Sequence, residues 1–175
     1  MTRILSRMLV AASLAAFAAG SAPAVFAAGA PAVSWVVQDK VSGQVIEIAK
    51  PTGTVTLDGN HPFEVRFIVK DPGRNGELAI GGKVVALQCH GDSSTGKGIH
   101  RALPQRVVPV VQGQPGDISL AFNAGGVTLC PGADTGESRI EAGRIVIRGS
   151  RIDKRDTRYQ ATGTLTIKLA PATSK

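Results

Sequence analysis

Hydrophobic residues alternate with polar ones along much of the chain, and this period of two restricts the fold more than any other feature. The clearest case runs from Phe63 to Lys70, where the odd-numbered positions are apolar and three of the four even-numbered positions are charged. The segment from Thr162 to Leu169 repeats the pattern, and Pro171 follows it. Because successive side chains of a β-strand point to opposite faces, both segments are predicted to be strands with one buried face.

Shorter segments of similar character fill much of the remaining chain, which contains 21 Gly and 10 Pro. Turn sequences such as Asp58-Gly59-Asn60 and Pro115-Gly116 separate nearly all of them. We predict further strands at 33–38, 45–49, 54–57, 83–88, 106–112, 118–122, 126–130 and 144–148. Many short strands without a helical period predict an all-β fold, namely an antiparallel β-sandwich of immunoglobulin-like or jelly-roll type in a single domain. A barrel is the alternative.

The first residues are predicted to be an export signal. Arg3 and Arg7 precede an apolar run from Met8 to Ala19, and the small residues that end at Ala27 fit cleavage by a signal peptidase. Gly and Ser residues and then Pro23 interrupt the run before it reaches the length of a membrane span. The mature protein is therefore expected to be periplasmic or secreted, without a transmembrane span. The predicted organisation is a secretory signal peptide at 1–28, a β-sandwich domain at 29–170 and a flexible tail at 171–175.

The two cysteines, Cys89 and Cys130, are expected to form a disulfide bond. An even number of cysteines in an exported chain most often means pairing, because the compartment is oxidising. Closing a loop of roughly 40 residues stabilises a fold by about 4 kcal/mol if the bond acts through the entropy of the unfolded chain.

The longest stretch without clear strand character extends from Cys89 to Pro104, and it contains candidate metal ligands. His90, Asp92 and His100 could together hold zinc or copper through imidazole and carboxylate groups. The same loop keeps open the alternative of a small hydrolase with a serine nucleophile and with His61, His90 or His100 as the base. The sequence thus offers a small periplasmic metal-binding protein or hydrolase as an alternative to a binding protein.

A fragment of a phosphate-binding loop also occurs in this stretch. Gly91 to Lys97 matches the glycine and lysine positions of that motif, but Gly98 stands where a Ser or Thr would bind magnesium. No helical pattern follows. We therefore predict neither a nucleotide ligand nor a cofactor.

Basic residues outnumber acidic ones, and they concentrate in one segment. Of 20 Lys and Arg and 13 Asp and Glu residues, only two Arg lie within 1–28, which leaves the mature chain a formal charge of about +5. Between residues 139 and 158, four arginines are predicted to form an anion-binding ridge: Arg144, Arg148, Arg151 and Arg155. Guanidinium groups hold phosphate, sulfate or carboxylate with paired hydrogen bonds. The alternative is a solvated face that only protects an edge strand from pairing.

These features together favour an exported, non-catalytic binding module that contacts an anionic envelope polymer or an acidic protein partner. A third class stays open, because the chain resembles fimbrial subunits in its size, its signal and its terminal alternating strand with Gly163 upstream. That resemblance implies a surface structural subunit that accepts a strand from a neighbour. The chain departs from that pattern, since Ser174 stands where a tyrosine is expected and both cysteines lie in the middle of the chain.

Overall fold

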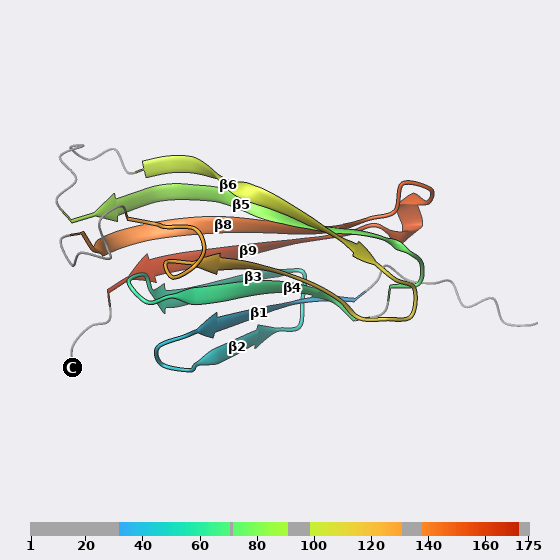
Figure 1. Cartoon of the computed structure of the whole chain (residues 1–175), viewed down its shortest axis with the longest axis horizontal. Coiled ribbons are helices and arrows are strands. Elements are labelled where there is room, and N and C mark those ends of the chain that lie inside the picture. Colours follow the sequence, from blue (N-terminus) through green and yellow to red (C-terminus); the bar gives the residue numbers. More distant parts are fainter. Residues whose placement is uncertain (1–31, 71, 91–98, 131–137, 172–175) are drawn as a thin grey trace, which may run out of the picture.

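The computed structural model describes residues 32–70, 72–90, 99–130 and 138–171. The described chain is built from β-strands, with one short 3-10 helix at Thr157–Tyr159 (Figure 1). The strands are β1 (Val33–Asp39), β2 (Val45–Ile48), β3 (Thr52–Asp58), β4 (Phe63–Val69), β5 (Gly76–Cys89), β6 (Ile99–Val110), β7 (Gly116–Phe122), β8 (Ile140–Ile152) and β9 (Ala161–Ala170). The predicted signal peptide and the last four residues lie outside the described part.

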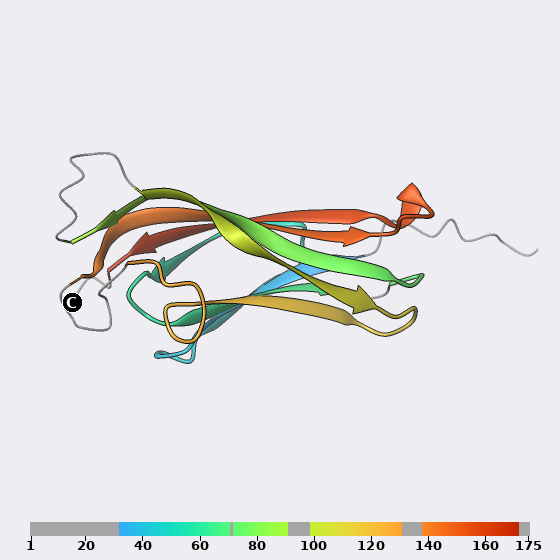
Figure 2. The same cartoon turned by 45° about the horizontal axis from the view of Figure 1, so that its top comes forward.

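The strands form two sheets that lie one above the other, as Figure 2 shows. Sheet A has the order β2-β1-β4-β7, and sheet B has the order β3-β9-β8-β5-β6. The predicted all-β class is confirmed, and the two layers are consistent with a β-sandwich. The expectation of a purely antiparallel fold is wrong, because β3 runs parallel to β9. The chain crosses from sheet A to sheet B between β2 and β3, and alternation within a strand does not encode the direction of such a crossing.

The core between the sheets is formed by the inward-facing positions of both. Trp35 of β1 and Phe67 of β4 lie in contact, with ring centroids 4.7 Å apart, and the Trp35 Nε1–H donates to the Pro51 carbonyl at 3.0 Å. Opposite these rings, sheet B places Gly149 and Gly163 directly side by side on β8 and β9. A Cβ atom at Gly163 would lie only 2.9 Å from the Phe67 ring. The two glycines therefore leave the space that the aromatic pair fills.

The sequence-based strand at 126–130 is wrong. The chain leaves β7 through Asn123 and Gly125, whose φ angles are 67° and 70°, and turns back on itself. The Val127 N–H donates to the Ala121 carbonyl at 2.9 Å, and only an isolated bridge joins Val127 to Phe122. Leu129 and Cys130 are buried and Val127 is partly buried, although the segment belongs to neither sheet.

Several strands are longer than predicted, most of all β5, β6 and β8. β6 begins at Ile99, so the second part of the expected loop up to Pro104 pairs with β5. β5 itself extends from Gly76 to Cys89 and contains register shifts against both of its neighbours. Each shift changes the face to which the following residues point, which obscures the alternation in the sequence.

Candidate functional site

The Cys89–Cys130 disulfide bond is present, with the two Cα atoms 5.9 Å apart. It ties the end of β5 to the turn that follows β7. Both cysteines are buried. Neither sulfur atom is therefore a thiolate that could act as a nucleophile or bind a metal.

The candidate metal ligands do not come together in the described residues. His90 is exposed, and its Nδ1 lies 3.0 Å from Glu141 Oε1. His100 is exposed on β6, and Asp92 lies outside the described residues. Within the ranges that the structure describes, no group of three His, Cys, Asp or Glu side chains is placed to hold a metal ion. The metal hypothesis has no geometric support from this part of the chain.

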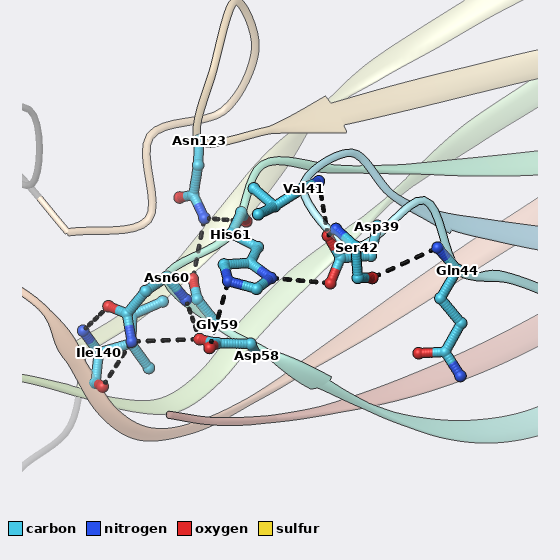
Figure 3. A network of polar contacts seen from close by, with 10 residues as sticks. All are labelled: Asp39, Val41, Ser42, Gln44, Asp58, Gly59, Asn60, His61, Asn123 and Ile140. Atoms are coloured by element: carbon cyan, nitrogen blue, oxygen red, sulfur yellow. Dashed lines mark hydrogen bonds and ion pairs between the residues drawn. The ribbon is translucent and has the colours of Figure 1, made fainter. Parts of the chain in front are cut away.

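A second candidate for chemistry, His61, belongs to a network of turn residues at the end of the molecule that carries the disulfide bond (Figure 3). The His61 Nδ1 lies 2.8 Å from Asp39 Oδ2, and its Nε2 lies 3.5 Å from Asp58 Oδ2. Both ring nitrogens therefore face carboxylates, and neither is left to accept a proton from a serine. The hydrolase alternative gains nothing from this histidine.

The rest of the network joins the turns of both sheets. Asn123 Nδ2 donates to the carbonyls of Gly59 and His61, at 2.8 Å in each case. Asn60 Oδ1 accepts the Ile140 N–H at 2.7 Å. These bonds satisfy backbone groups where four strands end or begin, so the network holds the end of the sandwich together.

Asp39 is expected to make the fold weaker in acid. Burial raises the pKa of its carboxyl group, but hydrogen bonds from His61, from the backbone of Ser42 and Val41 and from the Ser42 hydroxyl together lower this pKa from 3.8 to about 2. A carboxyl group with a lowered pKa in the folded state stabilises the fold above about pH 4, and this contribution disappears as the pH falls through about 2. The contribution is about 2 kcal/mol at most.

Urea unfolding measured between pH 7 and pH 2 tests this expectation. Asp39→Asn should be less stable than the wild type at pH 7, and the two proteins should converge towards pH 2. A difference in stability that stays constant over this range would contradict the assigned role of the Asp39 charge.

The outward face of sheet B carries a group of unpaired cations. Arg144 and Arg148 of β8 are exposed on the same face, as predicted. Lys168 of β9 lies directly opposite Arg144, and Lys83 of β5 lies opposite Val146, which is between the two arginines. We call Lys83, Arg144, Arg148 and Lys168 the cationic face.

None of the four side chains of the cationic face makes a hydrogen bond or an ion pair with another described residue. The carboxylates on the β5 and β8 strands lie near their ends, where Glu77 faces Lys154 at 3.8 Å and Glu141 faces His90 at 3.0 Å. The middle of the face therefore combines four cations with no described counter-charge.

The outward face of sheet A differs in this respect, because its cations are paired. The ion pairs on or beside it are Lys40 with Glu64, Arg66 with Asp117, and Lys70 with Glu47. Both faces are exposed to solvent, so solubility alone does not require one of them to be left unpaired. The contrast marks the cationic face as the stronger candidate for a binding surface.

Small neutral groups fill the space between these cations. Thr54 and Thr166 lie in one row with Val146 and Lys83 across four strands. Beside Arg148, a shallow hollow of about 260 Å³ opens over the register shift of β5. No large aromatic side chain stands on the face, so its chemistry is that of charge and hydroxyl groups.

The other two arginines of the predicted ridge lie elsewhere. Arg151 is 0% exposed, because it shares the inward side of β8 with Ile145 and Ile147. Arg155 is exposed in the connection between β8 and β9, at the end of the molecule. The single ridge of four arginines is therefore a wrong grouping. Because side chains alternate along a strand, the position of Arg151 four residues after Ile147 predicts that both point to the core.

No protein-family model matches the chain, and no curated protein sequence matches it. In the part of the chain that the structure describes, no helix has the length and apolar character needed to cross a membrane. The candidate site therefore depends on its geometry and charge.

Proposed function

We propose that the mature protein is an exported, non-catalytic binding module whose cationic face contacts an anionic envelope polymer. The observation that supports this most directly is the set of four unpaired cations on one exposed sheet face, opposite a face whose cations are paired. Signal cleavage and a periplasmic or secreted location are part of the proposal. The assignment of the sandwich to the immunoglobulin-like or the jelly-roll type stays a prediction.

The spacing of the cations favours a polymer over a single small anion. Arg144 and Arg148 are four residues apart on one strand, which corresponds to about 13 Å along the sheet. Lys83 and Lys168 extend the charge across neighbouring strands. A ligand with repeated anionic groups can contact several of these side chains at once, and the rigid sheet holds them in place before binding. Such contacts weaken with salt, because each releases counterions.

Heparin chromatography with the mature protein tests the proposal. Arg144→Ser combined with Arg148→Ser should elute at clearly lower salt than the wild type. The slope of log affinity against log salt should fall by about 1 for each cation removed, as for cation contacts to a nucleic-acid backbone.

The matched control removes the same formal charge from sheet A. Arg66→Ser combined with Lys70→Ser takes away two cations that are paired with carboxylates, and it should change elution much less. Equal shifts in both double variants would mean that net charge alone controls retention, and the assigned face would be wrong. Retention on an acidic protein but not on heparin would favour a protein partner over a polymer.

A further inference from the structure

The β4–β5, β6–β7 and β8–β9 connections lie at the end of the molecule opposite the disulfide bond (Figures 1 and 2). Residues of all three connections line a cleft there. Its volume is about 690 Å³. We call it the terminal cleft. Its charged lining residues are three cations, Arg74, Lys154 and Arg155, and two carboxylates, Glu77 and Asp153; Gly76 and Tyr159 also line it.

The buried Arg151 side chain lies directly behind the wall of this cleft. Its Nη2 donates to the Arg74 carbonyl at 2.6 Å, and its guanidinium carbon lies 6.0 Å from the centre of the Tyr159 ring. A Cβ atom at Gly76 would lie 3.5 Å from the same Nη2. Three residues that line the cleft thus contact or closely approach one guanidinium group.

The charge of Arg151 has no counterion among the described residues. Its Nε and Nη1 are buried without a hydrogen-bond partner. The nearby buried carboxylate, Asp153, accepts the Arg155 backbone N–H at 2.8 Å, and no described ion pair joins it to Arg151. A guanidinium group keeps its charge inside a protein, and a buried charge without a partner is strongly unfavourable. A bound anion would compensate it.

The rim of the cleft also presents positive charge. Arg74 stacks over the Tyr159 ring, with its guanidinium carbon 4.6 Å from the ring centre. Its nearest carboxylate, Asp156, is 3.8 Å away and also pairs with Arg158 at 2.8 Å. Two cations therefore share this carboxylate, which leaves the group positive as a whole.

Arg155 strengthens the positive character of the rim. Its side chain is exposed and has no carboxylate partner within the described ranges. Lys154 is paired only loosely, with its Nζ 3.8 Å from Glu77 Oε1 on the surface. Both side chains can turn towards a ligand at little cost, because surface ion pairs of this kind contribute little to stability.

We propose that the terminal cleft binds one oxyanion group, a phosphate or a carboxylate, carried by a small molecule. Arg151 supplies a fixed positive charge from behind the lining residues Arg74, Gly76 and Tyr159, and Arg155 and Lys154 supply direct hydrogen bonds from the rim. This site is separate from the cationic face, since it recognises a single group in a concave site rather than repeated charges on a flat surface. It does not depend on the proposed polymer contact.

Titration calorimetry and thermal unfolding of the mature protein test the cleft, with inorganic phosphate and acetate as probes at constant ionic strength. At least one probe should bind saturably and raise the melting temperature, because a ligand that binds only the folded state stabilises it. The preferred probe identifies the group as phosphate or carboxylate.

Variants assign the binding to the cleft. Arg155→Ser should weaken the affinity for the bound probe by about tenfold or more, the effect of one charge-assisted hydrogen bond. Arg151→Met should also weaken binding by about tenfold or more and still fold, because it removes an uncompensated buried charge and keeps an apolar chain of similar length. Arg144→Ser combined with Arg148→Ser should leave probe binding unchanged, which separates this site from the cationic face.

Several results would overturn the inference. The first is the absence of saturable binding for both probes, and the second is undiminished binding in Arg151→Met. If Arg151→Met does not fold, undiminished binding in Arg155→Ser overturns the inference in its place.

Discussion

Replacing Cys89 and Cys130 by serine is expected to lower the free energy of unfolding by about 4 kcal/mol. The bond joins residues 41 positions apart, and the loop that it closes contains β6 and β7, the neighbouring edge strands of the two sheets. Without it, the unfolded chain gains the entropy of that loop. The folded chain also loses the tie that holds the turn after β7 against the end of β5. Urea unfolding of the double variant measures the loss.

The reduced wild type is the matched control, since it removes the bond but keeps both side chains. It should lose most of the same stability in reducing buffer, whereas the double variant should not respond to the reductant. If reduction leaves the unfolding midpoint unchanged, the bond does not contribute to the stability of the fold. Mass spectrometry of protein from its native compartment should find no free thiol.

Alternation in the sequence best identified the strands that pair with their neighbours without a register shift. In β4, the predicted inward residues Phe63, Val65, Phe67 and Val69 are all buried, because the strand lies inside sheet A without a register shift. β5 was predicted only from 83 to 88, since its register shifts near Gly82 and Ala86 interrupt the period. The parallel pairing of β3 with β9 depends on contacts between distant parts of the chain, so the sequence of neither strand predicts it.

The candidate site was predictable only in part. Arg144 and Arg148 stand two periods apart on one strand, so the sequence was sufficient to place them on one face. Lys83 and Lys168 come from other strands, and only the pairing of those strands with β8 brings them alongside. The approach of Arg151 to the β4–β5 connection is likewise a result of tertiary packing. Its burial follows from the period of two, but its partners do not.

Phe67→Ala is expected to lower the free energy of unfolding by about 3 to 5 kcal/mol, the usual cost of emptying a buried aromatic site. Phe67 is 0% exposed, and its ring fills the space over Gly149 and Gly163 while it contacts Trp35. The converse change, Gly149→Ala, should cost about 1 to 3 kcal/mol, because its new methyl group would overlap the Phe67 ring. Urea unfolding of both variants measures these costs.

If Gly149 leaves room for the Phe67 ring, the effects of Phe67→Ala and Gly149→Ala on the free energy of unfolding should not be additive. In the Phe67→Ala background, Gly149→Ala should therefore cost much less than in the wild type, with a coupling above about 0.5 kcal/mol. Gly81→Ala is the matched control in the same sheet, because a Cβ atom there meets Gln105 at an ordinary contact distance of 3.4 Å. It should change stability little in either background. If the losses of unfolding free energy in Phe67→Ala and Gly149→Ala are strictly additive, the cost of Gly149→Ala arises from strain elsewhere in β8. Gly149 is then not needed to make room for the Phe67 ring.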